Sequence, residues 1–150
     1  MSTMFDKASF QRIRDRASRL QPDSQRLWGT LTVSKMLAHC SKSLETAVGD
    51  MRPSRMFIGR IIGFLIKGLA IHNDRPMRRN TPTDPALLSP VEPDFAAQHA
   101  AFLALMERFH LGGPSGCTQH PHSFFGRLTP EEWGILMYKH IDHHLRQFGV

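Results

Sequence analysis

The stretch TPEEWGILMYKHIDHHLRQF, residues Thr129–Phe148, combines a strong helix start with a regular apolar stripe. Thr129 suits the N-cap, Pro130 suits the first helical position, and Glu132 completes a capping box with Thr129. At about 100° per residue, the apolar side chains that share one face are Trp133, Leu136 and Met137. The stretch therefore predicts a long final helix with one face in the core.

Working outward from this helix, the sequence predicts three more long helices. One runs from Phe5 to about Leu20, and a second follows a cap at Thr32 or Ser34 and runs to about Val48. A third begins after Asp94 and ends at Gly112-Gly113-Pro114. No segment has the alternation typical of a strand, so we predict an all-α fold.

The stretch Met56–Ile71 is apolar but carries Arg60 and Lys67. It is shorter than the roughly 20 residues that a membrane span needs, so we predict a short buried or surface-packed helix and no membrane span. Amphipathic contact with a membrane is the alternative interpretation. Residues 73–93 hold five prolines and predict a long loop.

Length and composition indicate one domain that covers residues 1–150. The formal net charge is +6, but the basic residues are scattered and lack interleaved aromatic residues, which disfavours nucleic acid as a partner. The chain has two cysteines, and its N-terminus lacks the apolar core of a signal peptide, so we expect a cytoplasmic protein.

His140 and His144 lie four residues apart on the final helix, inside its apolar stripe. At that spacing both imidazoles can reach one ion. The alternative is a pair of histidines at the edge of the core, bonded to carbonyl groups or water. His39, at the edge of the second helix's apolar face, is our candidate for a third ligand. Asp142 and Arg146 fall on the opposite, solvated side of the final helix.

A rival cluster of metal ligands lies in the second loop and consists of Cys117, His120 and His122. Its spacing matches no standard zinc site. Cys117 is also a candidate nucleophile, although no Asn or Asp is placed to orient a base beside it. Cys40 points away from His39 and is expected to fill the core.

Three stretches of this chain resemble a bacterial family of unknown function in the DinB-like (damage-inducible) superfamily. They are KMLAHC at 35–40, FGRLTPEEW at 125–133 and KHIDHHLRQFG at 139–149. The resemblance implies an up-down-down-up four-helix bundle, here with an extra short helix and long loops. It also implies a divalent metal, zinc or nickel, held by His39, His140 and His144, with His143 outside the ligand set.

The resemblance further implies a metal-dependent enzyme that activates a thiol or water, as a thiol S-transferase or a hydrolase. The partners would then be a small-molecule substrate and, for the transferase, a low-molecular-weight thiol. The alternative is a non-catalytic metal-binding or stress-associated helical module. A homodimer through the outer helices is compatible with either function. The extra residues between His120 and Phe125 depart from the family pattern and leave the position of that loop open.

Overall fold

The computed structural model describes residues 1–150 and contains α-helices and short 3-10 turns but no strand. The prediction of an all-α fold is confirmed. The elements are α1 (Lys7–Ala17), α2 (Val33–Val48), α3 (Phe57–Ile71), η1 (Pro85–Leu87), α4 (Phe95–Gly112), η2 (Pro114–Gly116) and α5 (Pro130–Gln147).

Side-chain caps fix where the long helices begin. Thr32 accepts a hydrogen bond from the Lys35 amide at the start of α2, and Asp94 accepts one from the Ala97 amide at the start of α4. The predicted capping box of α5 is formed, because the Thr129 and Glu132 side chains each accept from the other's backbone N–H. The predicted helix starts for α2, α4 and α5 are confirmed.

The first helix is shorter than predicted. We expected it to begin near Phe5, but Asp6 is extended and its carboxylate accepts a hydrogen bond from the Ser9 amide. Asp6 is therefore the N-cap, and α1 begins at Lys7. At the other end, α1 stops at Ala17, three residues before the expected Leu20, which is nevertheless buried in the core.

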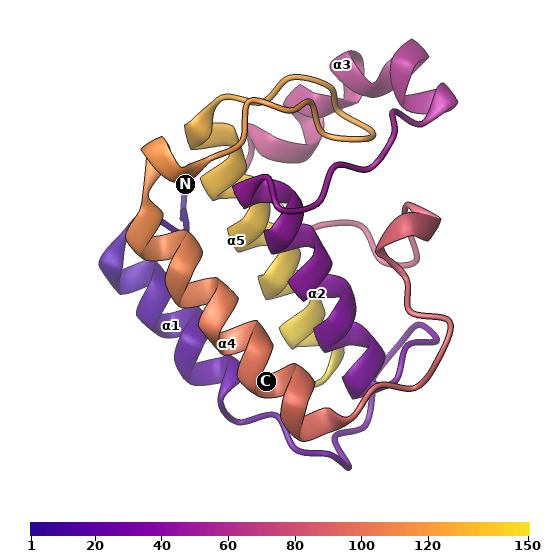
Figure 1. The fold of residues 1–150 in the computed structure, drawn as a ribbon, viewed down its shortest axis with the longest axis vertical. Coiled ribbons are helices and arrows are strands. Elements are labelled where there is room, and N and C mark those ends of the chain that lie inside the picture. The colour runs from indigo at the N-terminus through magenta and orange to yellow at the C-terminus, as the bar shows by residue number, and fades with distance from the viewer.

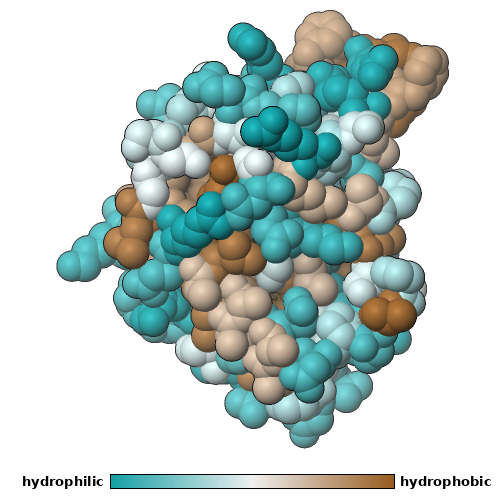
Figure 2. Space-filling view, viewed as in Figure 1, coloured by the Kyte–Doolittle hydropathy of each residue, from teal (hydrophilic) through white to brown (hydrophobic).

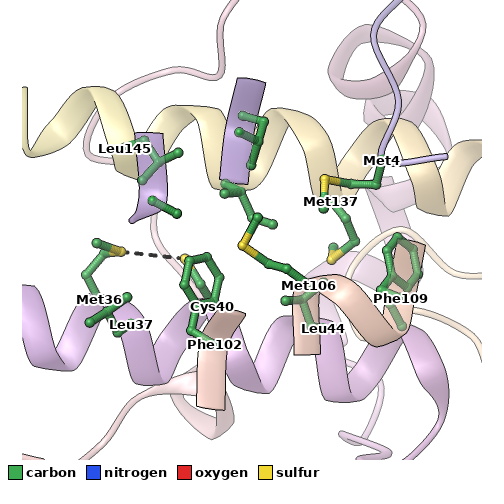
Figure 3. Packing of buried hydrophobic residues seen from close by; sticks show 14 of the residues in the cluster. Met4, Met36, Leu37, Cys40, Leu44, Phe102, Met106, Phe109, Met137 and Leu145 are labelled. Atoms are coloured by element: carbon green, nitrogen blue, oxygen red, sulfur yellow. Dashed lines mark hydrogen bonds between the residues drawn. The ribbon is translucent and has the colours of Figure 1, made fainter. Parts of the chain in front are cut away.

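The helices α1, α2, α4 and α5 lie side by side around a common core (Figure 1). Both α1 and α2 contact α4 on one side and α5 on the other. Figure 3 shows side chains of α2, α4 and α5 meeting in this core. Cys40 lies among them, fully buried beside Met36, so the prediction that Cys40 fills the core is confirmed.

The apolar helix α3 projects from one end of the four packed helices (Figure 1). It packs against α5 and against the loop that contains Phe124, where Gly59 and Gly63 let the helix approach the Phe124 backbone. Its remaining apolar side chains are largely exposed, so the helix is surface-packed and not buried. No helix in the structure is both long enough and apolar enough to cross a membrane.

Asp142 differs from the prediction, which put it on the solvated side of the final helix. Its side chain is nearly buried, because α1 packs along this face of α5 and brings Arg16 to it. The Arg16 guanidinium lies 2.6 Å from one Asp142 carboxylate oxygen, and Arg146 lies 2.8 Å from the other. Asp142 thus joins two helices.

Candidate metal centre

Three histidines from two helices meet at one point of the structure. His39 comes from α2, while His140 and His144 come from adjacent turns of α5, which packs against α2. Each histidine offers a ring nitrogen, and the three nitrogens lie within 4.8 Å of one another. The Nε2 atoms of His39 and His140 are 2.9 Å apart. These are the three histidines that the sequence suggested as ligands, and they are close enough together to hold a metal ion.

The side chain of Gln147 fixes which ring nitrogen of His144 carries the proton. Its amide nitrogen donates to the Trp28 carbonyl oxygen at 2.9 Å, so its amide oxygen must face His144. That oxygen lies 2.8 Å from His144 Nδ1 and can only accept, so Nδ1 is the protonated nitrogen. The lone pair of His144 is therefore on Nε2.

His39 is oriented by a backbone carbonyl in the same way. Its Nδ1 lies 3.4 Å from the Leu87 carbonyl oxygen, a long contact in which only the ring nitrogen can donate. The Lys42 ammonium donates to the Ala86 and Leu88 carbonyl oxygens and so anchors this short turn against α2. The Nε2 atom of His39 is left with its lone pair facing His140.

His140 has no such partner. Its Nδ1 is buried and makes no hydrogen bond within the protein, while its Nε2 faces the lone pair of His39. Without a cation, a neutral His140 can donate from Nε2 to the His39 lone pair, but its buried Nδ1 then has a lone pair and no donor. A divalent ion instead accepts a lone pair from each of the three rings.

Burial keeps the three imidazoles neutral. It lowers the pKa of His39 from 6.5 to about 4 and that of His144 to about 3. Burial is also the main cause that lowers the pKa of His140, and repulsion from the neighbouring histidines adds to it. Neutral imidazole is the form that binds a metal, so protons do not compete for this site near neutral pH.

The distances fit a small divalent ion with modest adjustment. Tetrahedral zinc with Zn–N bonds of about 2.0–2.1 Å holds its ligand nitrogens about 3.4 Å apart. The observed separations, from 2.9 Å up to 4.8 Å, bracket that value. Three imidazoles also leave at least one coordination position for a water molecule or a substrate.

Aromatic and cationic groups lie beside the three histidines. The His143 ring packs edge-on against His144 and against Trp28, with centroids 5.2 and 5.8 Å away. The Arg79 guanidinium stacks over Trp28, 3.9 Å from the ring centroid. His143 is thus a neighbour of the cluster and does not join it, as the family resemblance implied.

The rival cluster in the second loop is not formed. Cys117, His120 and His122 do not bring their ligand atoms together. His122 instead uses Nδ1 to accept hydrogen bonds from the Phe124 and Phe125 amides. The loop folds on its own backbone. Because Nδ1 accepts these bonds, the proton of the neutral His122 ring lies on Nε2, and neither nitrogen offers a free lone pair to a metal.

Cys117 also lacks the features of an activated nucleophile. Burial raises the pKa of its thiol to about 11, so the thiol is protonated at neutral pH. The hydrogen-bond partners of its sulfur are the backbone carbonyl oxygens of Gly113 and Pro130, and no base lies among them.

Sequence reasoning missed the residues that orient the cluster. Gln147 lies three residues after His144, a spacing at which helical side chains meet, so the sequence contained a signal for this contact. The sequence contained no signal for Leu87 and Trp28, because each acts through a backbone carbonyl that the fold alone brings into position.

A protein-family model described as "Protein of unknown function (DUF1569)" matches residues 5–149 of the chain. No curated protein and no solved structure matches it. The family description names no activity, so the geometry of the three histidines is the main guide to function.

Proposed function

The chain belongs to the DUF1569 family, and we propose that it binds a divalent metal ion through His39, His140 and His144. One observation carries the proposal: hydrogen bonds to Gln147 and Leu87 leave two imidazole lone pairs pointing at a third imidazole. A neutral His140 that carries its proton on Nε2 can satisfy the lone pair of His39 but then leaves its own buried Nδ1 without a partner, whereas a divalent ion accepts the lone pairs of all three rings.

Metal content tests this proposal directly. Protein purified without an affinity tag, after growth with zinc, nickel, iron and manganese, is expected to hold about one ion per chain. His140→Ala is expected to lose it, and His120→Ala, which changes a histidine outside the cluster, is expected to keep it. A metal-free wild-type protein whose unfolding is unaffected by added metal would contradict the proposal, since an ion at 100 times its Kd adds about 2.7 kcal/mol.

We further propose that the protein is an enzyme of the DinB-like type, either a thiol S-transferase or a hydrolase, with zinc or nickel as its metal. The resemblance of residues 35–40 and 139–149 to that superfamily supports this, as does the ring of four packed helices, which is compatible with its bundle topology. A divalent ion with an open position lowers the pKa of a bound thiol or water.

The residues around the cluster have separable tasks in this proposal. His39, His140 and His144 hold the ion, while Gln147 holds His144 in the tautomer that can bind it. The segment that contains Leu87 covers His39 and limits the access of water from that side. The exposed guanidinium of Arg79, held over Trp28, is available to an anionic thiol or substrate.

A non-catalytic metal-binding module is the alternative function, and water exchange separates the two. In manganese-loaded protein an open site keeps exchangeable water in the first shell, which enhances the relaxation of bulk water protons. We expect this enhancement, and we expect glutathione, used as a thiol probe, to reduce it. Manganese that relaxes bulk water no better than a fully enclosed ion would favour the non-catalytic module.

A further inference from the structure

The helix α3 exposes a continuous apolar face. Phe57 is 79% exposed, Phe64 67% and Leu69 77%, which is unusual for side chains of this size. At about 100° per residue these side chains share an arc of about 140°. We call the following six residues the apolar face of α3: Phe57, Ile58, Ile61, Phe64, Leu65 and Leu69. In Figure 2 brown residues protrude at the upper right, where Figure 1 places α3.

A basic hollow lies directly beside this face. Its volume is about 360 Å³, and its charged lining residues are all cationic: Arg55, Arg60, Lys67 and Arg127. Phe64, from the apolar face, lines the same hollow. Apolar and cationic groups therefore meet along one edge of α3.

The charge of this region is only partly neutralised within the protein. No Asp or Glu occurs in residues 51–73 or in the facing loop, residues 115–130. Glu132 pairs with Lys67 at 2.9 Å, but Arg60 and Arg127 are exposed and form no ion pair. The hollow therefore keeps a net positive charge that an anionic ligand can neutralise.

We propose that α3 docks onto the surface of an anionic lipid bilayer. The apolar face lies in the interface between headgroups and acyl chains, and the basic hollow binds lipid phosphate groups. The arginine and lysine stems on the flank of α3 reach past the apolar face toward the headgroups, as such side chains do at membrane surfaces. The helix lies in the interface, which is compatible with its short length and does not require a span.

Charge favours a bilayer over a second copy of the chain. Two α3 helices that paired through their apolar faces would bring two basic edges together, and the carboxylate beside each edge, Glu132, is already paired with Lys67 of its own chain. Each chain also carries a formal net charge of +6, so association of copies is opposed at long range as well. Anionic lipids supply the negative charge that a second copy lacks.

Sedimentation with lipid vesicles tests the proposal on the intact protein. We expect binding to phosphatidylcholine vesicles that contain phosphatidylglycerol, and little binding to vesicles of phosphatidylcholine alone. Phe64→Ser should weaken binding about tenfold. Leu111→Ser removes an equally exposed apolar side chain from α4 and should leave binding unchanged, because Leu111 is 74% exposed but lies outside α3.

The cationic contribution has its own variant and control. Arg60→Gln should weaken vesicle binding about fivefold and reduce its dependence on salt. Lys7→Gln, at an exposed cation on α1 that forms no ion pair, should have little effect. All four substitutions lie at exposed positions, and unchanged thermal unfolding would confirm that each variant is folded.

Three results would overturn the proposal. One is equal binding to neutral and anionic vesicles, and another is an equal loss of binding in Leu111→Ser and Phe64→Ser. The third is a dimer that forms without vesicles in sedimentation velocity and disappears in Phe64→Ser, which would assign the apolar face to a second copy. None of these results depends on the histidine cluster, whose residues lie outside the basic hollow and the apolar face of α3.

Discussion

At the scale of single residues, Gln147 links the histidine cluster to the backbone at Trp28. Its amide donates to the Trp28 carbonyl oxygen and accepts from His144 Nδ1, so the orientation of the amide and the tautomer of the ring are fixed together. Metal-binding histidines are commonly held in this way by an acceptor on the outer nitrogen. Gln147 is therefore a positioning residue, which acts on the metal through His144.

Replacing Gln147 by Met should weaken metal binding about 10- to 100-fold, because the His144 ring loses the acceptor that fixes its tautomer. Titration of the metal-free protein with zinc in the presence of a competing chelator measures this zinc affinity. Gln119→Met, at an exposed glutamine in the second loop, is the matched control and should bind zinc as the wild type does. Equal zinc affinity in Gln147→Met and the wild type would contradict the positioning role.

His122 should make the protein less stable as the pH falls from about 7 to 4. Burial lowers its pKa from 6.5 to about 4, and its Nδ1 must stay unprotonated to accept two backbone hydrogen bonds. Between these pH values the unfolded chain binds a proton that the native chain excludes, so the free energy of unfolding decreases. The expected loss is about 1–2 kcal/mol.

Urea denaturation of metal-free protein at pH 7 and pH 4.5 measures the contribution of His122. In His122→Asn the side-chain oxygen can still accept from the backbone but does not titrate, so the difference between the two pH values should shrink. His120→Asn is the control in the same loop. A difference that is the same in the wild type and in both variants would exclude His122 as a cause.

The identities of the three clustered histidines could be suggested from sequence, because spacing along a helix puts His140 and His144 on one face. The hydrogen-bond partners of the ring nitrogens that face away from the cluster could not be predicted from the sequence. The Leu87 carbonyl reaches His39 only through the path of a long loop, and periodicity contains no information about that path. Asp142 was misplaced for a related reason, since its burial depends on a second helix and not on α5 itself.

At the scale of elements, local capping explains why the helices were predictable. Thr32, Asp94 and Thr129 each use a side-chain oxygen to accept a backbone hydrogen bond, and such bonds depend on neighbours in sequence. The position of α3 was less predictable. Its apolar character suggested burial. Instead, the side of α3 that carries Gly59 and Gly63 packs on the Phe124 backbone, and the apolar face of α3 stays exposed.

Gly63→Ala should detach α3 from the loop that it packs against. A Cβ atom on Gly63 would collide with the Phe124 carbonyl oxygen, and a backbone atom cannot rotate away as a side chain can. We expect faster amide hydrogen exchange in residues 57–71 and a loss of stability of about 1–3 kcal/mol.

Gly68→Ala provides the control within the same helix. A Cβ atom there has open space around it, so the substitution should leave the docking of α3 intact. It should also favour the helix by up to about 1 kcal/mol, because Ala has the higher helix propensity. Equal exchange rates in α3 for Gly63→Ala and Gly68→Ala would contradict the proposed role of the close contact.

At the scale of the whole molecule, one ion-paired group connects the N- and C-terminal helices. Arg16 of α1 binds the Asp142 carboxylate of α5 and also donates to the Val150 carbonyl oxygen, 134 positions away in sequence. This contact closes the ring of packed helices beside the turn that carries His144. These Arg16 contacts, which do not involve the clustered histidines, therefore help to hold α5 in place relative to α1.

Asp142→Asn should destabilise the whole fold by about 1–3 kcal/mol, because the partly buried Arg16 guanidinium loses its charged partner. Thermal unfolding of metal-free protein measures this. Asp50→Asn is the control, since it removes an exposed pair with Arg108, whose contribution is expected to be within about 1 kcal/mol. A larger effect in Asp50→Asn than in Asp142→Asn would contradict this account.

The ring of four helices follows from features that sequence contains, namely helix length and apolar periodicity. The sequence pattern does not determine which helices become neighbours, because that depends on long-range packing. The contact between α2 and α5 is the decisive example, since without it His39 would be a solitary buried histidine on α2.

X-ray absorption at the zinc edge of the zinc-loaded protein tests the central claim most directly. We expect a first shell that contains three imidazole nitrogens at about 2.0–2.1 Å in the wild type. His140→Ala, which should not retain the ion on purification, is expected to lack this three-imidazole shell even when zinc is added in excess. The same spectrum for the wild type and His140→Ala, or a first shell that contains sulfur, would show that the ion is bound elsewhere and would contradict a centre built from His39, His140 and His144.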